Sequence, residues 1–568
     1  MEYKSEKKTC QNCQNDFTIE SDDFSFYEKV KVPPPTFCPE CRFQRRASWR
    51  NDFSLYNRKC DSCDMNVVSM YSPESNIIIY CNKCWWSDKW DGIESGKDYN
   101  FSENFFSQLN KLIYKIPHIA LVNDNNIASI KCEYTGDTWF SKNCYMTFCS
   151  WHIENVSYGY MVLAGKNMTD CTCILESSEW MYDCLDCSHS YKLKSSYFCV
   201  SCIDSDFLYD CRNCSDCFMC IGLRGEKYCF KNKKYTKEEY EKILSTYELN
   251  TYEGRQRAKK EFKEFILKYP RKYAHIIQSL NVTGDLLSNS KNSQNCFIGD
   301  KIENCKYIQQ GGKNLDCYDI TTSGEHELGY EGIVLDHSSN NKFGLFSVKS
   351  QFLEYNMHCH NCKYVFGCVG LKNKSYCIFN KQYKKEEYFE MVEKIKNHMN
   401  EMPYVDKKGN VYRYGEFFPI ELSYFGYNET IANYFFPLNE KEILDKNYKF
   451  QYNIQKTTGK QTIESTGVPI SLENVDESFI DNVFECIDCK RNFKVISDEF
   501  KFYKIMNLPL PRSCFYCRLN ERLFFRNPFK LWHRSCMKEG CNNEFETSYA
   551  PERPEIVYCE KCYQSEVY

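Results

Sequence analysis

The chain has 568 residues, of which 42% are hydrophobic, and it carries a formal net charge of -4 at pH 7. This composition excludes a disordered chain, and the acidic balance excludes a protein that coats nucleic acid non-specifically. No apolar run approaches the roughly 20 residues that a membrane-spanning helix needs. We therefore expect a folded protein of several domains that does not enter a membrane.

Cysteine pairs near the two ends of the chain form two matching series. The first series is Cys10/Cys13, Cys38/Cys41, Cys60/Cys63 and Cys81/Cys84. The second series is Cys486/Cys489, Cys514/Cys517, Cys536/Cys541 and Cys559/Cys562. The intervals between successive pairs are 24, 18 and 17 residues in both series, and only one pair differs, by a two-residue insertion. The pattern indicates a duplicated module.

Two CxxC pairs separated by a loop of about twenty residues are typical of a zinc site, because four thiolates close a tetrahedron around the ion. The sixteen cysteines predict about four Zn²⁺ per chain, each held by consecutive pairs, although a crossed pairing of the same cysteines is the alternative. Such closed sites hold structure, since no position is left for a reacting water. A disulfide framework is less favoured, because the polar start of the chain, residues 1–8, does not resemble a signal peptide. We expect a reducing cytoplasm.

The segment of residues 10–46 resembles a zinc-ribbon family whose members carry CxxC, a Phe, an aromatic FY stretch, a Pro and CxxCR. The resemblance recurs in the second module and implies a treble-clef-like fold. The whole chain is also similar to a family of cysteine-rich proteins from reduced-genome bacteria, through residues 85–91, 220–223, 427–430 and 436–438. Members of that family are sometimes labelled acyl-CoA transferases, but this chain lacks the long apolar strands that the α/β core of such an enzyme needs.

Between the terminal modules the pattern changes to short polar, cysteine and aromatic units, such as Asn143-Cys144-Tyr145 and Asp183-Cys184. No segment there sustains a helical period, so we predict short strands stacked as a parallel β-solenoid. A second internal repeat, at a constant offset of 148 residues, supports two copies. Each copy ends in a predicted helix, and the first of these starts at a capping box formed by Thr236 and Glu239.

The predicted fold is multidomain and mainly β, with duplicated four-cysteine zinc-ribbon or treble-clef modules at both termini flanking two short-stranded parallel β-solenoids with capping helices. The expected order begins with an N-terminal double zinc-ribbon module (residues 1–91), a helical connector (92–130), the first solenoid copy (131–235) and a helical capping segment (236–280). It continues with the second solenoid copy (281–383), a capping helix (384–402), an aromatic connector and linker (403–478), and a C-terminal double zinc-ribbon module (479–568). Within the capping segment, residues 252–276 are expected to be helical. Residues 456–477, rich in Thr, Ser and Gly, are the expected flexible linker.

A series of arginines follows the second cysteine pair of each module. If each of these pairs opens a helix, arginines spaced four residues apart lie on one face of that helix. In the N-terminal module these are Arg42, Arg46 and Arg50, and in the C-terminal module they are Arg518, Arg522 and Arg526. Such a stripe would contact successive phosphates of RNA or of a ribonucleoprotein. The alternative interpretation is that these arginines form ion pairs with Asp and Glu residues of the protein itself.

The other 21 cysteines lie between the two modules, where they either bind further metal or fill the solenoid interior as small apolar groups. An enzyme site, if the chain has one, is expected in the second solenoid, where side chains that can act as acid or base occur together. These are Glu325, His326, Asp336, His337 and His360. No catalytic motif is present, and no small-molecule substrate is inferred. We therefore expect a non-enzymatic, zinc-binding scaffold or adaptor that binds RNA. The alternatives are a protein-interaction module that uses the solenoid faces, and a transferase or hydrolase.

Overall fold

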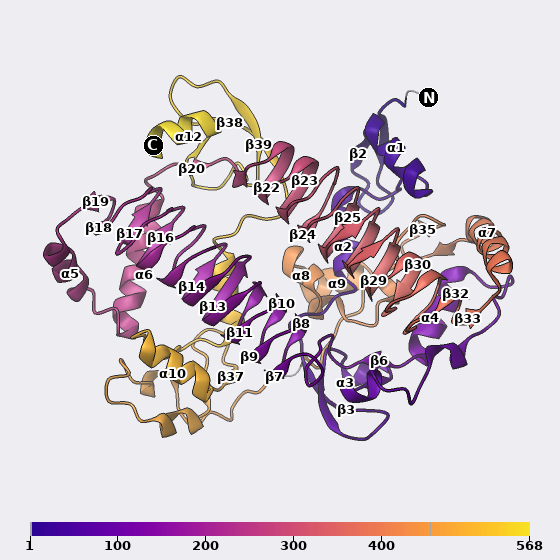
Figure 1. Cartoon of the computed structure of the whole chain (residues 1–568), viewed down its shortest axis with the longest axis horizontal. Helices are drawn as coiled ribbons and strands as arrows, with labels where there is room; N and C mark the ends of the chain where they lie inside the picture. The colour runs from indigo at the N-terminus through magenta and orange to yellow at the C-terminus, as the bar shows by residue number, and fades with distance from the viewer. Residues whose placement is uncertain (1–2, 455, 568) are drawn as a thin grey trace.

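The computed structural model describes residues 3–454 and 456–567. Its centre consists of two β-solenoids, each a sheet of 13 strands (Figure 1). Within each solenoid the strand pairs are parallel except the last, which is antiparallel. The predicted mainly β class with two parallel solenoids is therefore confirmed.

The first solenoid contains strands β7 (Ile130–Glu133), β8 (Gly136–Trp139), β9 (Lys142–Tyr145), β10 (Phe148–Trp151), β11 (Glu154–Ser157), β12 (Tyr160–Val162), β13 (Gly165–Ile174), β14 (Ser178–Leu185), β15 (Tyr191–Lys194), β16 (Ile203–Tyr209), β17 (Phe218–Ile221), β18 (Cys229–Phe230) and β19 (Lys233–Lys234). The second contains β21 (Ile276–Ile277), β22 (Leu280–Ser288), β23 (Lys291–Asp300), β24 (Gln309–Gly312), β25 (Tyr318–Gly324), β26 (His326–Glu327), β27 (Tyr330–Asp336), β28 (Ser338–Ser339), β29 (Lys342–Val348), β30 (Gln351–Met357), β31 (Lys363–Phe366), β32 (Ser375–Ile378) and β33 (Lys381–Gln382).

Each turn of these solenoids is a narrow coil, and at every corner of the coil one residue has the left-handed backbone conformation with positive φ. Residues 12 apart pair in register, as Glu154 does with Lys142 on one side and Lys166 on the other. Within a turn every third residue has a positive φ, for example Asn143 at 54° and Asn155, one turn later, at 55°. Asn and Asp adopt this conformation more readily than other non-glycine residues. The short Asn-Cys and Asp-Cys units of the sequence are therefore corner residues followed by residues that point inward.

Cysteine suits the interior because a turn this narrow has room only for small side chains. All 21 cysteines of the solenoids are buried. The inward-pointing thiols donate to backbone carbonyl oxygens, as Cys184 does to Tyr182 at 3.3 Å and to Leu193 at 3.4 Å. Cys149 and Cys173 differ, since they are corner residues with positive φ whose sulfurs contact side chains of the terminal modules. In the described part of the chain, the only groups of side chains that could hold a metal ion lie in the terminal modules. The structure therefore supports the interpretation in which cysteines fill the solenoid interior as small apolar groups, and not the one in which they bind further metal.

The two terminal modules have the same order of elements. The N-terminal module contains β1 (Glu6–Thr9), β2 (Asp16–Ile19), α1 (Ser21–Val30), α2 (Pro39–Ala47), β3 (Tyr56–Lys59), β4 (Asn66–Ser69), β5 (Ile79–Tyr80) and α3 (Asn82–Trp85). The C-terminal module contains β36 (Phe484–Glu485), β37 (Asn492–Phe493), α10 (Ser497–Ile505), α11 (Phe515–Leu523), β38 (Trp532–Ser535), β39 (Glu544–Thr547), β40 (Val557–Tyr558) and α12 (Glu560–Val567).

The first helix of each module packs on the solenoid that lies farther from the module along the chain, while Arg50 of the N-terminal module and Ser548 of the C-terminal module also contact the nearer solenoid (Figure 1). In the N-terminal module, the ring of Phe26 stacks on Tyr318 of the second solenoid, with centroids 3.7 Å apart. In the C-terminal module, the equivalent Phe502 stacks on Trp180 of the first solenoid, with centroids 6.0 Å apart. The two ends of the chain therefore cross, and each unit of module and solenoid is built from two distant segments.

Helices that connect the modules and solenoids form mostly where they were predicted. Helix α4 (Phe105–Lys115) ends just before Pro117, and α5 (Lys237–Ser245) begins at the predicted capping box. The prediction of a helix over residues 252–276 is wrong in its second half, since α6 (Tyr252–Ile266) ends early. Pro270 explains the end, because a proline four residues on would clash with the helix carbonyl of Ile266. The chain then forms β20 (Arg271–Lys272), which pairs with β40.

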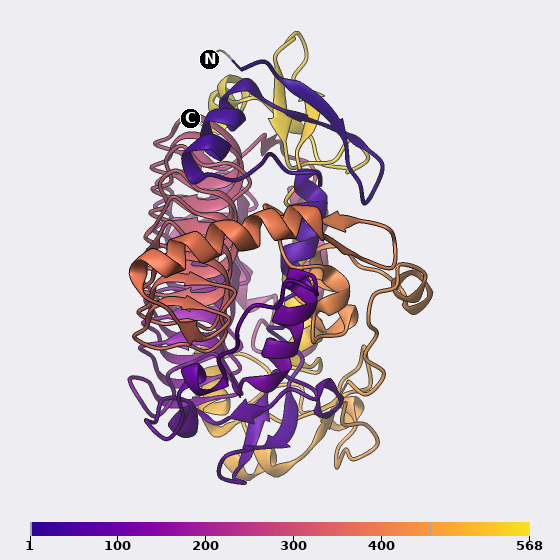
Figure 2. The same cartoon turned by 90° about the vertical axis from the view of Figure 1, so that its right-hand side faces the viewer.

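The connector wraps around the assembly as a packed segment. The capping helix α7 (Lys385–Glu401) precedes it and lies across the second solenoid in Figure 2. The connector itself contains β34 (Tyr404–Val405), β35 (Val411–Tyr412), α8 (Ile431–Phe435) and α9 (Glu440–Asp445). The expected flexible linker, residues 456–477, instead packs on the C-terminal module, where Val468 and Leu472 are buried in the cluster that contains Phe500. Among the described residues, no helix has both the length and the apolar character that crossing a bilayer requires.

A buried carboxyl group in the connector predicts a pH dependence of stability. Glu429 accepts hydrogen bonds from the Tyr56 hydroxyl and the Gly426 amide, both at 2.6 Å. Burial raises the pKa of Glu429 to about 7, so the folded state holds this proton more tightly than the unfolded state. The stabilising contribution is complete below the unfolded pKa and is lost as the pH rises through about 7.

We expect Glu429→Gln, which mimics the protonated acid, to stabilise the protein relative to wild type by about 3 kcal/mol at pH 8 and by much less at pH 5. Urea unfolding of both proteins at the two pH values measures the difference. The exposed Glu393→Gln variant is the control and should match wild type at both. A Glu429→Gln effect that does not change with pH would contradict the assignment.

Candidate metal centres and their docking helices

The structure gathers the sixteen predicted cysteines into four groups of four. The groups are Cys10, Cys13, Cys38 and Cys41; Cys60, Cys63, Cys81 and Cys84; Cys486, Cys489, Cys514 and Cys517; and Cys536, Cys541, Cys559 and Cys562. In each group all ligand atoms lie within 4.8 Å of one another. The groups are built from consecutive pairs, so the crossed arrangement is not the one that forms.

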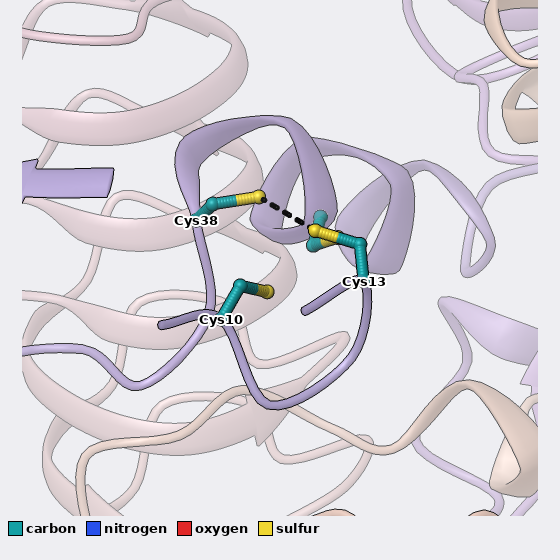
Figure 3. Close-up of side chains that lie close together, drawn as sticks. Cys10, Cys13 and Cys38 are labelled. Carbon is teal, nitrogen blue, oxygen red and sulfur yellow. Dashed lines mark hydrogen bonds between the residues drawn. The ribbon is translucent and has the colours of Figure 1, made fainter. Parts of the chain in front are cut away.

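The sulfur positions match the size of a four-thiolate zinc site. A zinc–sulfur bond of about 2.3 Å places the sulfurs of a tetrahedron about 3.8 Å apart. The observed distance between Cys13 Sγ and Cys38 Sγ is 3.7 Å, and Figure 3 shows the sulfurs of Cys10, Cys13 and Cys38 pointing toward a common centre. In the C-terminal module the distance between Cys489 Sγ and Cys514 Sγ is 3.6 Å. These groups could therefore hold a metal ion.

The chemistry of each group also favours a cation. Hydrogen bonds from Cys38 and Cys41 lower the pKa of the Cys10 thiol, and the same contact with Cys10 raises the pKa of Cys38 to about 12. Four thiols this close cannot all ionise unless a positive charge balances them. Backbone amides donate to several of the sulfurs, for example from Cys81 to Cys60 Sγ and from Cys514 to Cys486 Sγ, both at 3.2 Å. These bonds fix the thiolates for a metal.

The second cysteine pair of each module starts a helix, as predicted. Cys38 is the N-cap residue of α2, and Cys514 is the N-cap residue of α11. The metal site therefore fixes the start of the helix, and the helix carries the arginines away from it. Helix α2 ends at Ala47 and α11 ends at Leu523, so Arg50 and Arg526 follow the helices and do not lie on them.

The arginines of the N-terminal module are buried against the second solenoid. Arg42 Nη2 and Arg46 Nη1 contact the two carboxylate oxygens of Asp319, at 2.8 and 3.0 Å. Arg45, which the sequence analysis did not select, bridges Glu331 and Glu416, at 2.7 Å each. Burial opposes the charge on Arg42, but the attraction of Asp319 outweighs it and raises the pKa of Arg42.

The C-terminal module repeats this contact on the first solenoid. Arg518 Nε and Arg522 Nη1 contact the two oxygens of Asp170, at 2.8 and 3.2 Å. Arg522 also lies 3.6 Å from Asp183, one turn further along the solenoid. Asp170 of the first solenoid takes the place that Asp319 has in the second. The docking contact is thus duplicated together with the modules.

The prediction of a phosphate-binding arginine stripe is wrong, because the guanidinium groups face the protein interior. Arg42, Arg46, Arg50 and Arg522 are each exposed by no more than 1%. Arg50 pairs with Asp52 at 2.7 Å and with Asp137 at 3.0 Å. The remaining two, Arg518 and Arg526, are paired with Asp170 and Asp186. The alternative interpretation, ion pairing within the protein, is confirmed for all six.

The histidine-rich stretch of the second solenoid does not form one site. His326 is buried within the solenoid, and Glu331 is used by Arg45. Only His337 keeps nearby acidic partners, with its Nδ1 2.6 Å from Asp336 and its Nε2 3.1 Å from Glu325. Burial raises the pKa of Asp336 to about 6. His360 is half-buried and lies against Trp86, with ring centroids 5.1 Å apart.

The comparisons with known proteins add no relative: no protein-family model matches the chain, and no curated protein matches it significantly. The fold and the cysteine groups therefore define the class, which is a β-solenoid protein with modules at both ends whose four-cysteine groups could hold metal ions. The finer resemblance to a zinc-ribbon family stays a prediction.

Removing one buried guanidinium should destabilise the protein strongly, since Asp319 would be left charged without its full complement of partners. We expect Arg46→Met to cost about 3–5 kcal/mol of unfolding free energy. Arg522→Met, at the equivalent position, should cost a similar amount. Denaturant unfolding of the metal-loaded proteins measures both.

The matched control for these variants is Arg257→Met. Arg257 lies 3.6 Å from Glu248 on the surface, and its side chain is 56% exposed. The loss of such a pair costs less than about 1 kcal/mol. Equal effects of Arg46→Met and Arg257→Met would contradict the buried docking contact.

Proposed function

We propose that this protein is a structural scaffold in which four permanently bound zinc ions hold two β-solenoids in a fixed relative position. The proposal rests on one observation: the first cysteine group of each module lies at the start of a helix whose arginines contact a solenoid. Cys38 and Cys41 fix helix α2, and its arginines end on Asp319 and Glu331 of the second solenoid. Loss of the ion would release the helix that makes these contacts.

Zinc is the proposed metal because four thiolates in a closed tetrahedral arrangement suit this ion, and a closed site supplies structure without chemistry. The second group of each module serves the same end. It positions strand β5, which pairs with β6 (His118–Ile119), in the N-terminal module, and strand β40 in the C-terminal one. A reducing compartment is part of the proposal, because all 37 cysteines need to be thiols or thiolates.

RNA binding through the six arginines has no place in this proposal, because their guanidinium groups are buried and paired with carboxylates. The role that remains is to present a rigid surface to a partner. The exposed strands of the solenoids suit such a surface because they carry charges of both signs on neighbouring turns. Examples are Lys142 with Glu154 at 3.2 Å and Lys291 with Glu303 at 3.4 Å.

Elemental analysis of the purified protein should find close to four zinc ions per chain, and fewer than two would contradict the proposal. The double variant Cys38→Ser with Cys41→Ser should lose about one ion, because two of its four ligands are gone. The control is Cys305→Ser, a buried thiol of the solenoid interior, which should keep all four. Iron in place of zinc would overturn the assignment of the metal.

Hydrogen exchange tests whether the ion supports the docking contact. In Cys38→Ser with Cys41→Ser, amides around Asp319 and Glu331 of the second solenoid should exchange faster than in wild type. The matched variant, Cys514→Ser with Cys517→Ser, should instead expose the first solenoid around Asp170. Unchanged protection in both variants would mean that the metal groups do not support the scaffold.

A further inference from the structure

A cleft of about 780 Å³ lies where three parts of the chain meet. The first part is the end of the N-terminal module, residues 86–92. The second is the outer side of strands β8 and β10 in the first solenoid. The third is the outer face of the second solenoid, within residues 334–374. The docking of the N-terminal module on the second solenoid creates this cleft, since neither part encloses it alone.

Tryptophan is concentrated in the walls of the cleft. Four of the eight tryptophans in the chain line it, namely Trp86, Trp90, Trp139 and Trp151. All four are half-buried, whereas Trp85, next to Trp86 in the chain, is completely buried. Lys372 and His360 lie against the rings of Trp86 and Trp90, so the indoles that remain for a ligand in the cleft are those of Trp139 and Trp151.

The indole rings are held in position before any ligand arrives. Trp139 Nε1 donates to Asp137 at 3.0 Å, and Trp90 Nε1 donates to the carbonyl oxygen of Trp85 at 3.0 Å. Trp139 and Trp151 are partners in the register of β8 and β10, so they lie one strand spacing apart, about 4.8 Å. Flat apolar surfaces fixed in this way lose little entropy when a ring-shaped ligand stacks on them.

The facing wall is polar and repeats along the solenoid axis. Asp336, Val348, His360 and Lys372 follow one another at 12-residue intervals in register. Burial lowers the pKa of His360 to about 4, so this imidazole is neutral and can both donate and accept a hydrogen bond. Beside this row stand His337, Lys349, Asn361 and Asn373, again 12 residues apart. The wall offers hydrogen-bonding groups on successive turns.

The charges of the cleft balance and select against ionic ligands. The lining contains three lysines, Lys349, Lys372 and Lys374, and three aspartates, Asp88, Asp91 and Asp336. Lys374 is paired with Asp91 at 2.5 Å. Polyphosphate binding requires a positive excess, which these residues do not provide. Lys372 Nζ lies 4.2 Å from the ring centroid of Trp90 and 5.7 Å from that of Trp86, so the corner formed by these two indoles is already occupied by a cation of the protein itself.

From these walls we infer that the cleft binds a neutral carbohydrate chain, with sugar rings stacked on the indoles of Trp139 and Trp151 and hydroxyl groups bonded to the polar rows of the second solenoid. A pyranose ring combines an apolar face with a polar edge, which is what a cleft with one aromatic wall and one polar wall accommodates. The repeat of the polar groups on successive turns favours a chain of sugars over a single one. This inference goes beyond the scaffold role and gives the scaffold a ligand.

The test is a titration of the intact, zinc-loaded protein with neutral oligosaccharides, followed by tryptophan fluorescence and calorimetry. The probes are hexasaccharides of glucose, mannose, xylose and N-acetylglucosamine, extended by an array of neutral glycans. We expect saturable binding of at least one of them. Trp139→Ala and Trp151→Ala should each weaken that binding at least tenfold. The control is Trp532→Ala, in strand β38 of the C-terminal module outside the cleft, which should bind as wild type.

Two further arms keep the outcome decisive. Oxidation of the wild-type indoles by N-bromosuccinimide should slow when the bound glycan is present, which needs no variant to fold. Nucleosides and a short single-stranded RNA are titrated in parallel. The inference is overturned if no neutral glycan binds, if binding survives in Trp139→Ala with unchanged zinc content, or if the cleft tryptophans respond only to the nucleosides or RNA.

Discussion

The structure depends on a buried contact between arginines of the metal modules and carboxylates of the solenoids. Asp319 receives Arg42 and Arg46 from one helix, and Asp170 receives Arg518 and Arg522 from the other. An uncompensated buried charge is costly, so these partners need each other to remain in place. The metal groups matter because they set the position of the helices that deliver the guanidinium groups.

The solenoid is well suited to receive such a contact. Asp319 and Glu331 are corner residues with positive φ, and so are Asp170 and Asp183. Successive corners of this kind stand one strand spacing apart, which places two carboxylates side by side on adjacent turns. A helix with arginines three and four residues apart matches that spacing. The regular backbone of the solenoid thus converts two acidic corners into a docking surface.

Much of this arrangement was predictable from the sequence, because cysteine spacing and internal repeats are local signals. The CxxC pairs predicted all four groups, and the Asn-Cys and Asp-Cys units predicted the solenoids. The pairing of Arg46 with Asp319 was not predictable, since 273 residues separate them and an arginine series looks the same whether it faces solvent or a carboxylate. The acidic corners gave only a weak signal, because Asp is common at left-handed corners for conformational reasons alone. The Trp-lined cleft was missed because its walls come from three distant segments.

The exchange of partners between the two ends also constrains how the protein is made on the ribosome. The N-terminal module emerges first, but the solenoid that it covers is not complete until more than 280 further residues have been synthesised. At about 5–20 residues per second, its arginines wait tens of seconds for their acidic partners. The first solenoid waits longer still, since its own cover is the last segment of the chain to appear.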